Sequence, residues 1–180
     1  MLPDEVVQSY TLQAGRDCPA VSLYVSLDEA SLQVLGSQTR IERVPIAENL
    51  RHDQLDDRIT REWLEAEEQS DHADVPVSRA TLGFFWRLAQ TLKARREVVR
   101  GKPESFNRPD YSFKLDRPSN ETPPKGDETV LIGVRQRGSP LDLMVAEAMI
   151  LANSTWGQWM ASLGVPGIYR SQASMAPGVK

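Results

Sequence analysis

The sequence SPLDLMVAEAMILAN occupies residues 139–153 and predicts a long helix around which the rest of the chain is arranged. Ser139 is a good N-cap, because its hydroxyl can accept a hydrogen bond from a backbone N–H of the first turn. Pro140, at the first helical position, has no N–H that would need a partner. The apolar pattern continues to about Leu163, and Gly164 is expected to end the helix. Residues 148–169 carry no charge, but Gly, Pro, Asn and Gln interrupt them, so we expect a buried core helix and not a membrane span.

Glu147 is the unusual residue of this helix, since apolar side chains surround it on a helical wheel. A carboxylate on an apolar face is unfavourable unless it finds a partner. Two interpretations stay open: Glu147 pairs with a nearby arginine such as Arg135 or Arg137, or it lines a cavity and is held there by the helix. Asn153 is also polar within this helix, and we expect it to hydrogen-bond a loop backbone.

The N-terminal half of the chain predicts strands followed by helices. Residues 1–48 predict an antiparallel meander of three strands at 20–27, 31–35 and 39–46, with turns at 28–30 and 36–37. Residues 49–102 predict two helices. The first is about four turns long and carries apolar residues at helical spacing, namely Leu55, Ile59, Trp63 and Leu64. The second is capped by Ser78 and ends near Gly101.

Residues 103–138 predict strands at 111–115 and 128–136, separated by a loop, and residues 139–180 predict the long helix and the start of a further strand. The predicted fold class is therefore α+β, with antiparallel strands packed against three main helices. A chain of 180 residues suits a single domain.

Composition excludes some classes of protein. Hydrophobic residues make up 40% of the chain and charged residues 26%, which is enough for a core and unlike a disordered sequence. The formal net charge of −4 argues against a free-standing RNA binder, because phosphate contacts normally require a basic surface. Cys18 is the single cysteine, so no intramolecular disulfide can form and a reducing cytoplasm is expected. The first residues lack the basic and apolar regions of a secretory signal.

Clustered charges suggest chemistry, but each cluster also has a structural explanation. The acids near residue 52 could hold a divalent cation, or they could complement the helix dipole; they are Asp53, Asp56 and Asp57, beside His52. Residues 51–74 contain nine acids against three arginines, which is typical of a solvated face. The basic side chains near the end of the second helix could contact RNA or only stabilise that helix end; they are Lys93, Arg95, Arg96, Arg100 and Lys102. His52, His72 and Cys18 lack the spacing of a zinc site.

Two stretches near the C-terminus resemble the catalytic (RNB) domain of the ribonuclease II and ribonuclease R family. They are VAEAMILAN at residues 145–153 and LGVPGIYR at 163–170. Three upstream stretches are similar to family elements in the same order: MLP at 1–3, CPAVS at 18–22 and LRHDQL at 50–55. The resemblance covers nearly the whole chain.

The resemblance implies a function and a division of labour. Members of this family hydrolyse single-stranded RNA from its 3′ end, with Mg²⁺ held by an aspartate cluster. That cluster precedes the MLP element, and an arginine-containing segment that assists at the scissile phosphate follows the strand at 168–170. The resemblance therefore implies a partial RNB domain, internal to C-terminal, that contributes RNA-channel surface and is inactive alone. Mg²⁺ is expected in the complete enzyme and not on this chain; single-stranded RNA is the expected partner, without a membrane or a DNA preference.

The resemblance also assigns candidate RNA-binding residues. Glu147 matches the helix glutamate that faces the RNA 3′ end, and its replacement by alanine is expected to leave the fold intact. Asn153 and Arg170 match pattern positions with support roles. His52 stands where the family places a tyrosine near the terminal bases, and a histidine can also stack on a base. No catalytic residue and no metal ligand is assigned to this chain.

Two alternatives to this assignment remain. The chain could be a non-catalytic RNA-binding, protein-binding or scaffold protein with a degenerate RNB fold. It could also be an unrelated metal-dependent hydrolase that uses Asp53, Asp56 and Asp57.

Overall fold

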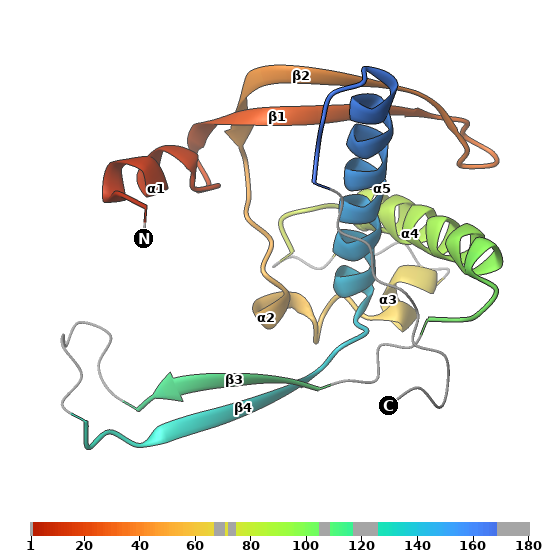
Figure 1. Ribbon diagram of the computed structural model, residues 1–180. Helices are drawn as coiled ribbons and strands as arrows, with labels where there is room; N and C mark the ends of the chain where they lie inside the picture. The colour runs from red at the N-terminus through yellow and green to blue at the C-terminus, as the bar shows by residue number, and fades with distance from the viewer. Residues whose placement is uncertain (1, 67–70, 72–74, 105–108, 117–125, 169–180) are drawn as a thin grey trace, which may run out of the picture.

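The structure is a computed structural model that describes residues 2–66, 71, 75–104, 109–116 and 126–168, except the side chains of His52, Asp53 and Gln136. Its strands form two separate antiparallel pairs, β1–β2 and β3–β4. Figure 1 shows these two hairpins toward opposite ends of α5, with the remaining long helix, α4, beside it. The α+β class with antiparallel strands is confirmed.

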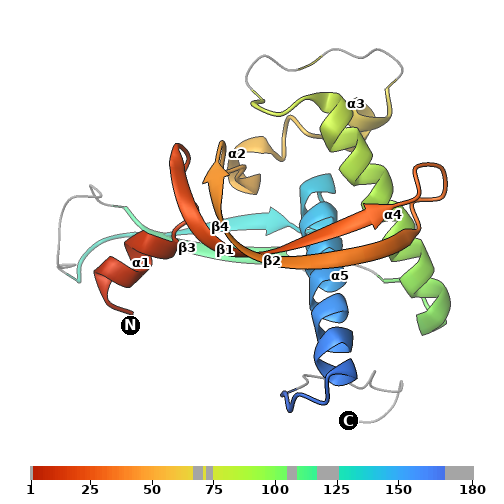
Figure 2. The ribbon, with the colours of Figure 1, turned by 90° about the horizontal axis from the view of Figure 1, so that it is seen from above.

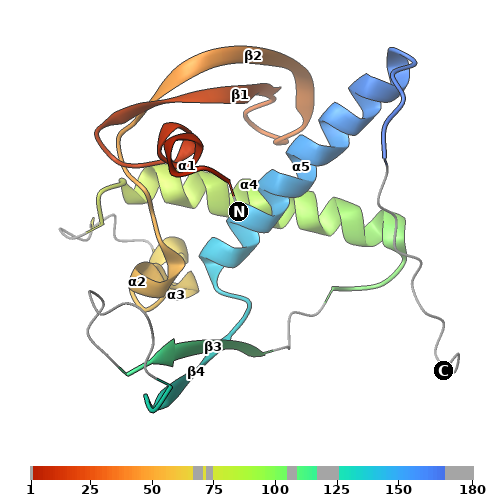
Figure 3. The ribbon, with the colours of Figure 1, turned by 60° about the vertical axis from the view of Figure 1, so that its left-hand side comes forward.

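The two long helices form as their cap residues predict. Helix α4 (Arg79–Arg100) begins at Ser78, whose hydroxyl accepts from the N–H of Thr81, and it ends at Gly101 with φ 71°. Helix α5 (Pro140–Ser162) begins at Ser139, whose hydroxyl accepts from the N–H of Asp142 at 3.2 Å. The two helices cross and pack against each other, as Figure 3 shows. This crossing brings Glu147 of α5 beside Arg96 of α4.

The N-terminal sheet has two long strands, so the prediction of three short ones is wrong. Strand β1 (Arg16–Leu27) pairs with β2 (Val34–Ile46), and Gly36 lies opposite Ser26 within the ladder and not in a turn. The single turn is closed by Asp28, whose carboxylate accepts from the N–H and the hydroxyl of Ser31 at 2.8 and 2.7 Å. This local side-chain bonding makes the reversal at residues 28–33 and leaves 34–46 extended.

The segment after β2 is broken into two short helices, so the prediction of one helix of about four turns is wrong. They are α2 (His52–Leu55) and α3 (Arg61–Glu65). Thr60 has an extended backbone between them, and its hydroxyl accepts from the N–H of Trp63 at 3.2 Å. A threonine that caps a new helix interrupts the preceding one. A further short helix, α1 (Asp4–Tyr10), was not predicted; Pro3 and two acids in its first turn were the available signal.

The core lies where α2, α3 and the first turns of α4 and α5 meet. Its buried residues are Leu55, Ile59, Leu64, Val75, Leu82, Trp86 and Leu141. The prediction that α5 is buried along its length is wrong, because Val145 and Met149 are exposed and Trp159 is exposed by 52%. The β1–β2 hairpin passes over α5 on one side only, as the view in Figure 2 indicates, and Trp156 donates to the Thr39 hydroxyl there. Within the described ranges, no helix combines the length and the apolar character needed to cross a membrane.

The second hairpin carries an exposed apolar face. Strands β3 (Pro109–Leu115) and β4 (Val130–Gln136) pair Phe113 with Ile132, and both side chains are more than half exposed. The neighbouring pairs on the same face are also apolar; they are Tyr111 with Val134 and Leu115 with Val130. Alternate residues of a strand share a face, so these six side chains form one continuous surface.

Candidate functional site

Glu147 is fully buried and ion-paired at the crossing of the two long helices. Its side chain is 2% exposed, and its Oε1 accepts a hydrogen bond from Nη2 of Arg96 at 2.5 Å. Arg96 lies in the last third of α4. The interpretation that Glu147 is paired with arginine is thus confirmed, but the arginine comes from another helix than the sequence suggested.

The pairing of Glu147 with Arg135 or Arg137 is wrong. Arg135 donates instead to Asp56 and Asp142, at 2.7 and 2.8 Å, and Arg137 donates to Asp110 at 2.7 Å. The reason is the length of α5. Glu147 lies seven residues beyond Pro140, which is roughly 10 Å along the axis at about 1.5 Å per residue. The arginines that precede α5 remain at its start and meet the acids there.

A cavity of about 510 Å³ lies between β1, α4 and α5, and Glu147 is one of the residues that line it. The other lining residues are apolar; they are Leu23, Val25, Leu27, Phe84, Phe85, Leu88, Ala89, Leu92, Met144, Ala148, Leu151 and Ala152. Phe85 and Ala148 are exposed, so the cavity reaches the surface. Its volume falls within the range of about 300–1,000 Å³ that small-molecule sites occupy.

The second oxygen of Glu147 accepts no hydrogen bond from the residues that the structure describes. Among the side chains that the structure describes, Arg96 alone donates to Glu147, and it donates to Oε1. Oε2 therefore remains as an acceptor on a residue that lines an otherwise apolar cavity. A pocket of this kind, apolar with one precisely held polar group, orients a ligand through that group.

Arg96 is itself held by a second carboxylate. The same Nη2 donates to Glu104, and Glu104 also accepts from Arg100 at 3.1 Å. The hydrogen bond to Glu147, and then that to Glu104, raise the pKa of Arg96 above its ordinary value. The hydrogen bond from Arg96 lowers the pKa of Glu104. The result is a chain of alternating charges from the end of α4 to the centre of α5.

A family model described as the RNB domain matches residues 1–178. The chain belongs to the RNB domain family. No match was found among curated proteins or among solved structures. The resemblance carried by the helix motif at residues 145–153 is thereby confirmed, and with it an exoribonuclease-type family whose members bind single-stranded RNA and depend on Mg²⁺.

The other candidate residues of this RNB domain stand apart from Glu147. Asn153 lies on α5 and is exposed, and its expected hydrogen bond to a loop backbone stays a prediction. His52 begins α2, and its side chain is not described. Arg170 lies outside the described residues. The RNA-binding roles of all four candidates remain predictions.

Sequence reasoning missed the partnership of Arg96 and Glu104 with Glu147. The sequence did indicate that Arg96 lies on the buried face of α4, since it follows the buried residues Ala89 and Trp86 by seven and ten positions, which is helical spacing. A cation that continues a buried stripe requires an anion opposite it, and Glu147 is the acid on the apolar face of α5. Neither helix alone reveals that the two stripes meet.

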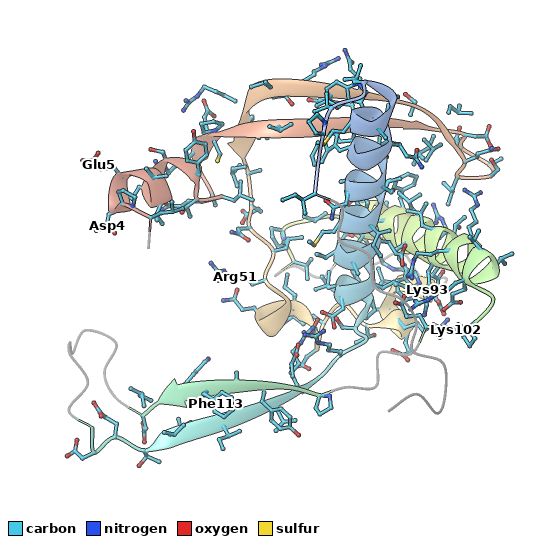
Figure 4. All side chains as sticks on the ribbon, viewed as in Figure 1. Asp4, Glu5, Arg51, Lys93, Lys102 and Phe113 are labelled. Carbon is cyan, nitrogen blue, oxygen red and sulfur yellow. The ribbon has the colours of Figure 1, made fainter. Side chains whose placement is uncertain are left out.

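The basic cluster near the end of α4 is largely occupied within the fold of this RNB domain. Lys93 pairs with Glu97 at 3.7 Å, and Arg95 donates to the backbone carbonyls of Ser31 and Leu32. Figure 4 places Lys93 and Lys102 toward the same end of α4, well away from Phe113 on β3. These contacts give Lys93 and Arg95 structural partners, and RNA binding by the cluster stays a prediction.

Of the acids near residue 52, Asp56 is engaged within the fold. Asp56 accepts from Arg135, which joins α2 to the start of α5. In the part of the chain that the structure describes, no group of three or more His, Cys, Asp or Glu side chains is placed to hold a metal ion. The described residues therefore do not fit the Mg²⁺ on which the RNB family depends.

Proposed function

We propose that this chain forms part of the RNA channel of a ribonuclease II-type 3′→5′ exoribonuclease and receives the 3′ end of single-stranded RNA at Glu147. The observation that carries the proposal is the bonding of this carboxylate at the cavity. Arg96 holds one of its oxygens, and none of the described residues donates to the other. Membership of the RNB family supplies the class of substrate.

The geometry supports a defined role for each group. Oε2 of Glu147 can accept hydrogen bonds from the hydroxyls of the terminal ribose, which are the groups that distinguish RNA from DNA. Apolar side chains of β1, α4 and α5 line the rest of the cavity around this acceptor. A hydrogen bond to a charged acceptor contributes about 1.5–3 kcal/mol, and more when water is excluded.

The chemistry at the phosphodiester is proposed to come from outside this chain. In the family, Mg²⁺ stabilises the charge that develops at the scissile phosphate. Among the described carboxylates, Asp56 is bound by Arg135 and offers no open metal site. We propose that the chain alone does not degrade RNA. We also propose a cytoplasmic location, because a protein with a single cysteine forms no internal disulfide and suits a reducing compartment.

Incubation of the chain with 5′-labelled single-stranded RNA and Mg²⁺ tests the proposed lack of activity. No release of nucleoside monophosphates is expected. Processive shortening of the RNA that EDTA abolishes would overturn this part of the proposal and would assign the chemistry to residues of this chain.

Binding measurements test the role of Glu147 without requiring catalysis. A short 5′-fluorescein RNA is compared with the same RNA ending in a 2′,3′-dideoxynucleotide, by fluorescence anisotropy at low salt. The wild-type chain should bind the ribose end about tenfold more tightly, which corresponds to one charged hydrogen bond. The preference should fall to below about twofold in Glu147→Gln, which keeps the shape but loses the charge. Equal binding of both ends by the wild type would end the proposal.

A protein-binding or scaffold function is the second candidate, and the exposed apolar face of β3–β4 favours it. Six apolar side chains cover one face of this two-stranded hairpin. An isolated two-stranded hairpin is only marginally stable, so packing of this face against another protein would stabilise it. This candidate predicts that the wild type has no preference for a ribose end and that Phe113→Ser leaves RNA affinity unchanged.

A further inference from the structure

The guanidinium of Arg96 bridges two carboxylates that come from different parts of the fold. Nη2 donates both to Glu147 on α5 and to Glu104, which lies just beyond α4. We infer that Arg96, braced by Glu104, is the positioning residue that turns Oε2 of Glu147 toward the cavity. This inference rests on the proposed function and extends it to two residues that do not line the cavity.

Glu104 is itself held in place by α4. After Gly101 the chain turns back, and the N–H of Glu104 donates to the carboxylate of Glu97 at 2.7 Å. Arg100, on the last turn of α4, donates to the other carboxylate oxygen of Glu104 at 3.1 Å. Glu104 therefore presents Oε2 to Arg96 from a rigid helix end.

Arg96 donates to Glu147 although one of its own N–H groups is left without a hydrogen-bond partner among the described residues. Its Nε is buried and has no acceptor among the described residues, although Nη2 serves two carboxylates. An unsatisfied buried donor is unfavourable and is retained where another requirement fixes the group. The requirement here is the orientation of Glu147, because a carboxylate fixed through one oxygen can direct the other.

The ion pairs also keep Arg96 charged. Its two carboxylates hold the pKa of Arg96 above an already high value, so the guanidinium stays protonated throughout the physiological range. The cationic Arg96 thus remains a donor to Oε1 of Glu147 at 2.5 Å over that range.

The test uses the same pair of RNA ends on the full chain, with Arg96→Met, Arg96→Lys and the double variant Arg96→Met with Glu147→Met. Arg87→Met is the matched control, because Arg87 is exposed on the same helix. The ratio of the two dissociation constants is decisive. A folded variant that is merely less stable loses affinity for both RNA ends alike, so its ratio stays constant.

The expected ratio is below about twofold in Arg96→Met, intermediate in Arg96→Lys and unchanged from about tenfold in Arg87→Met. The double variant should recover melting temperature relative to Arg96→Met but not the ratio, since it removes the buried charge together with its partner. A full ratio in folded Arg96→Met overturns the inference. If Arg96→Met does not fold, a full ratio in Arg96→Lys overturns it.

The two proposals fail differently. A wild type that does not prefer the ribose end, or a Glu147→Gln variant that keeps the preference, overturns the proposed function and the positioning role with it. Loss of the preference in Glu147→Gln together with its full retention in the Arg96 variants overturns the positioning role alone.

Discussion

Arg96 on α4 and Glu147 on α5 are 51 residues apart in the chain, yet they form a 2.5 Å ion pair where the two longest helices cross. The side chain of Glu147 is 2% exposed and that of Arg96 is 23% exposed. The pair therefore ties the helices together, and Glu147 also lines a cavity. Structural and functional interpretations of Glu147, which the sequence presented as alternatives, describe one arrangement.

Glu147→Ala should destabilise the protein, contrary to the expectation from the sequence that the fold would be unaffected. Removing one partner of a buried pair leaves the other charge uncompensated, and a loss on the order of 3 kcal/mol in the free energy of unfolding is expected. Urea denaturation followed by circular dichroism measures it. Glu48→Ala, at an exposed position, is the control and should change the free energy by less than about 0.5 kcal/mol. A Glu147→Ala variant as stable as the wild type would contradict the ion pair.

Stability should fall with acidification partly through Glu104. The hydrogen bond from Arg96 holds the pKa of Glu104 below its ordinary value of 4.5. A carboxylate with a depressed pKa in the folded state contributes stability that is present above its unfolded pKa and is lost as the pH falls through the folded pKa. The free energy of unfolding, measured by urea titration from pH 7 downward, should decline below about pH 4.5 less steeply in Glu104→Gln than in the wild type. Identical slopes would show that Glu104 does not contribute.

Gly83 within α4 and Gly101, which caps its end, should respond oppositely to alanine. Gly101 ends the helix with φ 71°, a conformation in which a Cβ is strained, so Gly101→Ala should cost about 1 kcal/mol. Gly83 lies within the helix, and a Cβ there meets nothing within 4 Å. Gly83→Ala should therefore stabilise the protein by roughly 0.5–1 kcal/mol through helix propensity. Thermal melts of both variants, side by side, check the signs; a shift in the same direction would be inconsistent with this geometry.

Two isoleucines should differ strongly under the same substitution. Ile59 is 0% exposed in the core, and Ile132 is 62% exposed on β4. Ile59→Ala is expected to lower the free energy of unfolding by about 2–5 kcal/mol, because it leaves a cavity. Ile132→Ala should change it by less than about 1 kcal/mol. Comparable losses, measured by urea denaturation, would mean that the apolar face of β3–β4 is covered in the folded protein.

Cap residues explain why the two long helices could be predicted closely. Ser78, Ser139 and Gly101 act on their own helix ends through hydrogen bonds to neighbours within a few residues. Family membership was also readable, because the motif at residues 145–153 and the elements upstream of it keep their order along the chain. Thr60 and Asp28 are local signals as well. The capping bond of Thr60 competes with a continuous helix over α2 and α3, and the bonds of Asp28 compete with the predicted second turn at residues 36–37. The alternation of apolar residues alone did not reveal which would prevail.

The sequence by itself determined the α+β class, the limits of α4 and α5, the RNB family and the presence of an acid on an apolar helix face. Each of these depends on short-range bonding or on the order of residues. Only the tertiary structure decided that Arg96 is the partner of Glu147, that Arg135 belongs to Asp56 and Asp142, and that Asn153 is exposed. The physical reason is that these outcomes depend on where α4 crosses α5 and on which side of α5 the β1–β2 hairpin lies. Packing of the whole chain sets both.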